Sequence, residues 1–147
     1  MQIRPEMQRS ALSIAHDAVL PSQKQRRTVV IVDDSDLCRK ATSRMLERAG
    51  HTTICMANPI GFTAVLRDRR PDLALVDVNM PTLRGDHLVS IATKHAHGGG
   101  CPIVLFSDRP AVELGDLVRR CGAAGYVQKS SDWPGVLKAI EKFLPAR

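Results

Sequence analysis

The sequence predicts an α/β fold, a doubly wound five-stranded parallel sheet with helices on both faces, and three observations support this prediction. From Thr28 onward, short apolar runs rich in β-branched residues alternate with amphipathic stretches of helical length. The run over residues 28–32 is unbroken, which suits a strand buried on both faces. The chain has 147 residues, 44% of them hydrophobic, which is enough for one core without disulfides or a structural metal.

Each element has its own local signal. The expected strands cover residues 28–32, 52–56, 73–76, 102–106 and 125–128. The first helix runs from about Ser35, a good N-cap, to Ala49, and Gly50 follows where a left-handed residue is favoured. Asn58 and Pro59 predict a cap and the first turn of the second helix.

The other three helices follow from the spacing of apolar residues. The third has Leu88, Ile91 and Ala92 on one face and ends near Lys94, before a flexible connection over residues 95–100. The fourth spans residues 112–121 and is stopped by Gly122. The last spans residues 136–144 and has the clearest periodicity.

Charge and composition limit the function classes. The net charge is +6, but residues 1–27 alone hold five basic residues against two acidic ones, and we expect them to form a mobile extension. The remaining charge is not clustered with aromatics, so nucleic acid is not an expected partner. No apolar run approaches the roughly 20 residues of a membrane span, and no signal peptide is evident, so a cytoplasmic location is expected.

The cysteines show no metal-binding spacing. Cys38, Cys55, Cys101 and Cys121 are far apart, with no C-x-x-C pair and no histidine at zinc spacing. We expect them to be reduced residues of the core or of helix faces.

Polar residues end four of the expected strands. Asp33 and Asp34 follow the first, Asp77 the third, Ser107 the fourth and Lys129 the fifth. Ligands of open parallel sheets bind at this edge. Three carboxylates close together repel one another unless a cation lies among them, and their oxygens suit Mg²⁺. Lys129 and Ser107 could then bind a phosphoryl group, and an aspartate at the metal is a competent nucleophile toward phosphorus.

Together these motifs resemble the CheY-like receiver domain of bacterial response regulators. The resemblance covers about residues 28–144 and assigns residues 28–147 to one receiver domain. Its motifs are Val32-Asp33-Asp34, the segment from Asp72 to Pro81 with Gly85, Ser107, and the segment from Gly122 to Lys129. It implies a flavodoxin-like strand order of 2-1-3-4-5.

The resemblance also implies roles for individual residues. Asp77 matches the aspartate that takes a phosphoryl group from a histidine kinase or a histidine phosphotransfer protein. The Mg²⁺ ligands would come from Asp33, Asp34, Asp77 and the backbone carbonyl of Asn79. Lys129 and Ser107 match the phosphoryl-binding pair. Ser107 and Tyr126 would form the switch that alters the face of helix 112–121, strand 125–128 and the last helix, where a downstream protein binds.

Three residues depart from the family pattern. Ser130 follows Lys129 where the family usually has a proline with a cis bond, and Asp108 replaces a small residue beside the expected phosphorylation pocket. Arg109 occupies a position that, with Asn79, tunes dephosphorylation in this family. We therefore predict an altered lifetime of the acyl phosphate, in a direction that the sequence does not assign.

The leading hypothesis is a single-domain response regulator in a phosphorelay, which is not an enzyme beyond assisting its own phosphorylation and dephosphorylation. The alternative is a receiver-like adaptor that does not depend on phosphorylation, suggested by Asp108 and Ser130. A phosphatase of the haloacid dehalogenase type needs a second acid where Asn79 stands. A nucleotide or flavin module would need a glycine-rich loop in place of Asp33-Asp34-Ser35.

Overall fold

The computed structural model describes residues 25–81, 83–94 and 100–146. Its five strands form one parallel sheet in the order β2-β1-β3-β4-β5, which confirms the predicted fold class and strand order. The strands are β1 (Thr28–Val32), β2 (Thr52–Met56), β3 (Leu73–Val76), β4 (Ile103–Ser107) and β5 (Gly125–Gln128). The expectations for most of the N-terminal extension and for the connection over residues 95–99 lie outside the described residues.

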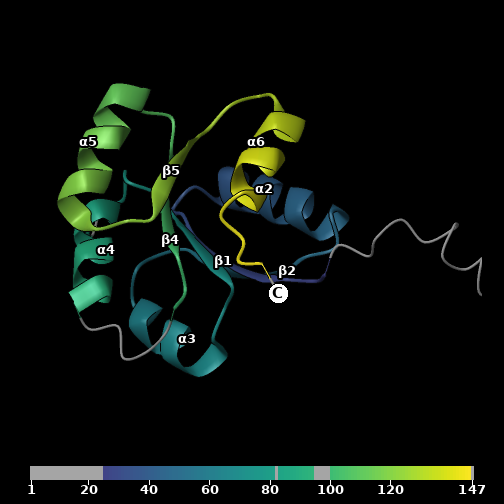
Figure 1. Cartoon of the computed structure of the whole chain (residues 1–147), viewed down its shortest axis with the longest axis horizontal. Helices are drawn as coiled ribbons and strands as arrows, with labels where there is room; N and C mark the ends of the chain where they lie inside the picture. The colour runs from purple at the N-terminus through teal and green to yellow at the C-terminus, as the bar shows by residue number, and fades with distance from the viewer. Residues whose placement is uncertain (1–24, 82, 95–99, 147) are drawn as a thin grey trace, which may run out of the picture.

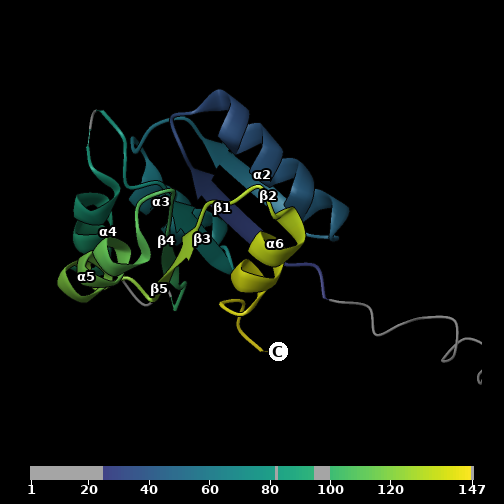
Figure 2. The ribbon, with the colours of Figure 1, turned by 90° about the horizontal axis from the view of Figure 1, so that it is seen from above.

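Five helices cover the sheet. They are α2 (Asp36–Arg48), α3 (Phe62–Arg69), α4 (Gly85–Lys94), α5 (Ala111–Cys121) and α6 (Trp133–Glu141). Helices α2 and α6 pack on one face of the sheet, and α3, α4 and α5 pack on the other (Figure 1). The turned view shows the sheet between these two layers (Figure 2).

The core is divided by the alternation of side chains along each strand. In β1, Val30 and Val32 face α3, α4 and α5, whereas Val29 and Ile31 face α2 and α6. All four valine and isoleucine side chains are fully buried or nearly so. The unbroken apolar run predicted this, because a strand covered on both faces has no solvent side.

Three predicted helix-end signals are present, and one predicted helix start is wrong. The Ser35 side chain accepts a hydrogen bond from the backbone N–H of Cys38, and Gly50 and Gly122 have positive φ. However, α3 begins at Phe62 and not at Pro59, because the Asn58 carboxamide oxygen accepts from the N–H of Ile60 and makes a turn first.

Helices α4 and α6 and strand β4 also differ from the prediction. The buried face of α4 contains Leu88 and Ala92 as predicted, but its third residue is Val89, because Ile91 is 43% exposed. Helix α6 ends at Glu141, although Phe143 and Leu144 still pack against the core beyond it. Strand β4 is shifted by one residue from the predicted range and includes Ser107.

The amino edge of the sheet, where the strands begin, carries buried charged and titratable groups. Arg27 Nη1 lies 3.8 Å from Asp72 Oδ1, and the second carboxylate oxygen of Asp72 accepts from the N–H of Thr28 at 2.8 Å. His51 Nε2 lies 3.4 Å from Glu141 Oε2. These contacts join the starts of β1, β2 and β3 to the end of α6.

All four cysteines carry free thiols. Cys38 lies on α2, Cys101 precedes β4 and Cys121 ends α5, but Cys55 is exposed on strand β2 and is therefore neither a core nor a helix-face residue. Among the helices that the structure describes, none combines the length and the apolar character required to cross a bilayer.

Candidate functional site

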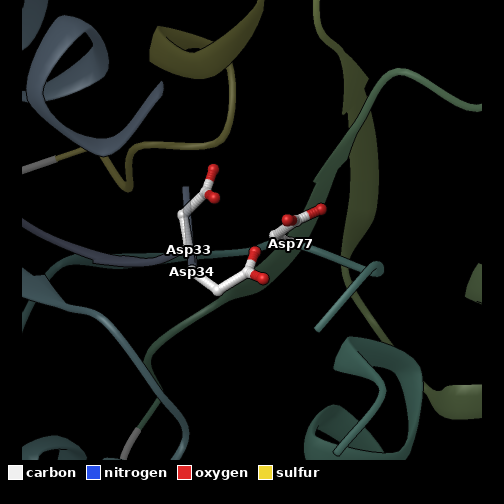
Figure 3. Close-up of side chains that lie close together, drawn as sticks. All are labelled: Asp33, Asp34 and Asp77. Atoms are coloured by element: carbon white, nitrogen blue, oxygen red, sulfur yellow. The ribbon is translucent and has the colours of Figure 1, made fainter. Parts of the chain in front are cut away.

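Three carboxylates gather at the carboxyl edge of the sheet, just beyond β1 and β3 (Figure 3). Asp33, Asp34 and Asp77 each offer an oxygen atom, and these atoms lie within 4.8 Å of one another. Asp33 and Asp77 are buried, whereas Asp34 is exposed. The neighbouring register of β1 and β3 brings the two strand ends together, as the sequence predicted.

Asp33 is fixed by three contacts. One carboxylate oxygen accepts from the N–H of Ser35 at 2.9 Å, and the other accepts from Lys129 Nζ at 2.9 Å. Its backbone carbonyl accepts from the guanidinium of Arg39 at 2.7 Å. With a side chain only 1% exposed, Asp33 is held in one orientation at the end of β1.

The negative charge of Asp77 is less well compensated by its neighbours than that of Asp33. Burial raises the pKa of Asp77 to about 6, and the charges of Asp33 and Asp34 act in the same direction. Lys129, whose Nζ lies 3.7 Å from Asp77 Oδ1, and the N–H of Asn79, at 3.2 Å, partly offset this increase in the pKa. One oxygen of Asp77 has no hydrogen-bond partner among the described residues.

The chain passes very close to Asp77 at the start of α4. A Cβ atom at Gly85 would overlap the backbone carbonyl of Asp77, so only glycine fits there. The N–H of Gly85 donates to the carbonyl of Val78 at 3.1 Å. This contact folds the segment after β3 back over the strand end and fixes the backbone that carries Asp77.

Lys129 and Ser107 join β5 and β4 to the acidic cluster. The N–H of Lys129 donates to the carbonyl of Ser107 at 2.7 Å, which continues the pairing of the two strands. Burial alone would lower the pKa of Lys129, but the hydrogen bond to Asp33 and the charge of Asp77 raise it above its usual value. The ammonium also lies 5.3 Å from the centre of the Phe106 ring, a cation–π distance.

Ser107 is fully buried, and its hydroxyl oxygen accepts from the N–H of Arg109 at 3.2 Å. The same turn carries Asp108, whose side chain is exposed. Ser107 therefore ends β4 at the same edge of the sheet as the acidic cluster, while Asp108 is exposed in the turn after β4.

Arg109 bridges three segments at the edge of the cluster. Its Nε donates to the side-chain oxygen of Asn79 at 2.9 Å, and its Nη1 lies 2.8 Å from Glu113 on α5. The side chain of Gln128 donates to the backbone carbonyl of Arg109 at 3.0 Å. Two positions that the sequence grouped only by resemblance, Asn79 and Arg109, are thus in direct contact.

Tyr126 is half-buried on β5 and packs against the core layer of α4 and α5. A Cβ atom at Gly115 of α5 would lie 3.9 Å from the Tyr126 ring, so the ring lies against that helix. After Lys129, the chain continues through Ser130 without a cis peptide bond; none occurs in the described ranges. Trp133 begins α6 and is 37% exposed.

Sequence reasoning missed two residues near the cluster. Arg39 lies one turn into α2, and no spacing rule indicates its contact with the carbonyl of Asp33, which lies before the helix. The Cys38 thiol interacts with both Asp33 and Lys129, and burial raises its pKa. Nothing in the sequence distinguishes Cys38 from an ordinary helix residue.

The charges of this site are suited to a divalent cation. Three carboxylates lie close together, and Lys129 Nζ contacts two of them, Asp33 and Asp77. Burial is the main cause of the raised pKa of Asp77, and the charges of Asp33 and Asp34 add to it, so a cation at this position would stabilise the ionised carboxylates. Carboxylate oxygens with water in the remaining positions form the type of site that Mg²⁺ prefers. The donor set therefore fits the metal that the sequence predicted.

The chain matches the model of the response regulator receiver domain over residues 29–141. It therefore belongs to the response regulator receiver family, whose members are signalling modules of two-component systems that work with kinases and downstream effectors.

Individual relatives agree with this assignment. Protein PilH of Pseudomonas aeruginosa is 30% identical over 116 residues, which cover 79% of this chain and 96% of PilH. The transcriptional regulatory protein CseB of Streptomyces avermitilis is 34% identical over 116 residues, which cover 79% of this chain but only 48% of CseB. The solved structure of the chemotaxis response regulator CheY4 of Vibrio cholerae matches with a TM-score of 0.73 and 26% identity, over 82% of this chain and 100% of CheY4.

Proposed function

We propose that this receiver accepts a phosphoryl group on Asp77 and that the modified form changes a partner-binding surface or passes the group on. The donor would be a histidine kinase or a histidine phosphotransfer protein, and we place the protein in the cytoplasm with such a donor. The observation that carries the proposal is the position of Asp77, a buried carboxylate that lies 3.7 Å from Lys129 Nζ and keeps one oxygen without a hydrogen-bond partner among the described residues.

The proposed reaction is an in-line displacement at phosphorus. A carboxylate oxygen of Asp77 forms the new P–O bond, the P–N bond of the phosphohistidine breaks, and the leaving imidazole nitrogen takes up a proton. Mg²⁺, held by Asp33, Asp34, Asp77 and the backbone carbonyl of Asn79, would neutralise the charge that gathers on the phosphoryl oxygens.

The chain's own residues would complete the site. Lys129 would move its hydrogen bond from Asp33 to a phosphoryl oxygen, a short displacement because its Nζ already lies 3.7 Å from Asp77. The Ser107 hydroxyl, whose oxygen accepts from the N–H of Arg109, would donate its own hydrogen to another phosphoryl oxygen.

The same movement suggests the switch. Ser107 and Tyr126 lie on adjacent strands, and the Tyr126 ring lies against α5. A shift of Ser107 toward the phosphoryl group would open space for Tyr126 and alter the face formed by α5, β5 and α6. We propose this face as the docking surface of the downstream protein.

The test is phosphorylation by a small donor. Incubation with acetyl phosphate and Mg²⁺ is expected to add one phosphoryl group to the wild type, seen by intact mass, and none to Asp77→Asn. Asp86→Asn is the matched control, because Asp86 is also a buried aspartate but pairs with Arg84 away from the cluster. It should still be modified.

If the wild type shows no adduct, binding of beryllium fluoride separates rapid hydrolysis from a lack of reactivity. Mg²⁺-dependent binding of beryllium fluoride that is lost in Asp77→Asn would support the proposal. No binding would contradict it and favour the phosphorylation-independent adaptor.

A further inference from the structure

Exposed basic residues gather at the amino edge of the sheet, opposite to the acidic cluster. In this parallel fold each helix runs back from the carboxyl edge to the amino edge, so the ends of all five described helices lie there (Figure 1). The exposed basic residues at these ends and just before β1 form what we call the basic surface: Arg26, Arg48, Arg69, Arg70, Lys94, Arg119, Arg120 and Lys142.

Nearby acids neutralise little of this charge. Within the basic surface, only Arg119 and Arg120 have an ion-pair partner among the described residues, and they share the single carboxylate of Asp116. The exposed acids Glu47 and Asp68, near the ends of α2 and α3, already contact other side chains. The basic surface therefore keeps a large positive excess.

Helix macrodipoles account for only part of this pattern. A basic residue in the last turn of a helix offsets the negative partial charge at that end, which is the ordinary reason to find one there. Each end carries about half an elementary charge, so five ends would offset about two or three of the basic residues. Helices α3 and α5 each end in two arginines, more than their dipoles require.

Arg70 occupies a backbone conformation that usually belongs to glycine. Its φ of 44° and ψ of 58° lie in the left-handed region, and within the described ranges no other residue except glycine has a positive φ. Gly50 and Gly122 have positive φ after α2 and α5. The Arg70 guanidinium makes no hydrogen bond or ion pair with a described residue that would offset this strain, so the fold gives no reason for an arginine there.

We propose that the basic surface binds the anionic headgroups of a lipid bilayer, with the carboxyl edge facing away from the membrane. Each lysine or arginine near an anionic bilayer strengthens binding about fivefold. The chain enters β1 at the same edge, and residues 1–27, with five basic residues against two acidic ones, add positive charge there. The headgroups would repel the acidic cluster at the opposite edge, which fixes the orientation.

The layout of the basic surface favours a bilayer over a nucleic acid. Its charges are spread over the ends of five helices, whereas recognition of duplex DNA places one helix or ribbon in a groove. Binding of single strands uses exposed aromatic rings on which bases stack. Among the described residues the one exposed Phe, Trp or Tyr is Trp133, which lies at the start of α6 and therefore at the other edge.

The test is co-sedimentation of the full chain with lipid vesicles, without Mg²⁺ or a phosphodonor. Vesicles of phosphatidylcholine alone are compared with vesicles in which about a third of the lipid is phosphatidylserine. We expect binding to the phosphatidylserine vesicles only, and we expect it to weaken as the salt concentration rises. Because phosphorylation is not involved, the result does not depend on the function proposed for Asp77.

A triple variant tests the basic surface itself. Arg48→Gln, Arg70→Gly and Lys142→Gln together remove one charge from each of three helix ends. The partition coefficient for phosphatidylserine vesicles should fall about a hundredfold, and the proposal requires at least a tenfold decrease. Circular dichroism of the same sample shows whether the variant is folded.

The matched control changes the net charge equally at the other edge. Leu37→Glu, Val112→Glu and Ser131→Glu replace exposed residues at the starts of α2, α5 and α6. A five-residue strand such as β1 separates the two edges by about 16 Å, which exceeds the Debye length of about 10 Å at 0.1 M salt. The control should therefore bind within about twofold of the wild type.

Arg70→Gly alone separates binding from folding. Glycine adopts positive φ without strain, so this variant should unfold at the same temperature as the wild type or at a higher one. It should still bind phosphatidylserine vesicles about fivefold more weakly. A lower unfolding temperature together with unchanged binding would give Arg70 a structural role and contradict the proposal.

Three further outcomes would overturn the proposal. The first is equal binding of the wild type to the two kinds of vesicle. The second is an equal loss of binding in the triple variant and in the control, which would mean that net charge matters and the basic surface does not. The third is tighter binding to a DNA duplex than to the vesicles at the same salt concentration, which would assign the basic surface to a nucleic acid.

Discussion

The two edges of the sheet carry their charges in opposite ways. At the amino edge, the buried Arg27 lies beside Asp72 and the buried His51 lies beside Glu141, so each of these two buried groups has an acidic neighbour. At the carboxyl edge, three carboxylates share the single ammonium of Lys129.

This difference assigns a stabilising role to the amino edge of the sheet and a functional role to the carboxyl edge. The contacts at the amino edge tie the strand starts together, and removing the carboxylate of Asp72 would leave the buried guanidinium of Arg27 without its acidic neighbour. The carboxyl edge keeps an excess of negative charge, which destabilises the protein alone but prepares it for a cation and a phosphoryl group. The predictions below test the contrast from the largest expected effect to the smallest.

The largest effect should come from breaking a pair at the amino edge. Asp72→Ala removes the carboxylate beside Arg27 and the acceptor for the N–H of Thr28. We expect the free energy of unfolding to fall by about 3 kcal/mol, measured by urea denaturation. Asp68→Ala, which removes an exposed acid paired with Arg67, is the control and should cost much less. A decrease of less than about 1 kcal/mol in the free energy of unfolding for Asp72→Ala would contradict the stabilising role assigned to the amino edge.

At the carboxyl edge, removing a charged side chain should increase the free energy of unfolding rather than decrease it. Because the folded-state pKa of Asp77 is raised from 3.8 to about 6, the folded protein holds its proton to a higher pH than the unfolded chain. This group therefore lowers stability as pH rises from about 4 to about 6, and the penalty persists at pH 7.

Asp77→Asn should then stabilise the metal-free protein at pH 7 by on the order of 1 to 2 kcal/mol. The gain should shrink toward zero near pH 4, as followed by urea denaturation across this pH range. Addition of Mg²⁺ should stabilise the wild type more than the variant. A variant that is less stable than the metal-free wild type at pH 7 would show that the carboxyl edge is not under-compensated.

A smaller effect is expected at the rim of the acidic cluster, where Arg109 contacts Asn79. Arg109→Ala should speed hydrolysis of the acyl phosphate by a few-fold, because it removes the hydrogen bond that holds the side chain of Asn79, two residues after Asp77. Asn79→Ala should act through the same contact, so the two changes should be non-additive in a double-mutant cycle by about 0.5 to 1 kcal/mol. The rate of hydrolysis is followed by the decay of the phosphoryl adduct in intact-mass spectra. An unchanged rate in both single variants would refute this prediction.

The smallest effect should come from a charge cluster on the surface of α5. Asp116 lies 2.7 Å from Arg119 and 3.3 Å from Arg120, and all three side chains are more than half exposed. Asp116→Ala should change the free energy of unfolding by less than about 0.5 kcal/mol, because water and salt screen such pairs. A cost as large as that of Asp72→Ala would mean that burial is not what distinguishes the two edges.

Much of this arrangement could be predicted from the sequence, because strand ends are visible as polar residues after apolar runs. Asp33, Asp34, Asp77 and Lys129 were placed together for that reason, and the structure brings them to one edge. The partner of Lys129 could not be predicted, since the choice between Asp33 at 2.9 Å and Asp77 at 3.7 Å depends on side-chain packing.

Other features depend on contacts between elements that periodicity does not encode. The start of α3 was predicted too early because an Asx turn at Asn58 uses the same residue types as a helix cap. The pairing of Arg27 with Asp72 joins residues 45 positions apart along the chain, and no local pattern indicates it.

The most direct measurement is to locate the phosphoryl group on the chain. After incubation with acetyl phosphate and Mg²⁺, reduction with borohydride converts an aspartyl phosphate to homoserine, which peptide mass spectrometry assigns to a position. We predict homoserine at position 77 in the wild type and only when Mg²⁺ is present. Homoserine at another aspartate, or its formation at position 77 without Mg²⁺, would contradict the account of the acidic cluster as a metal-dependent phosphorylation site.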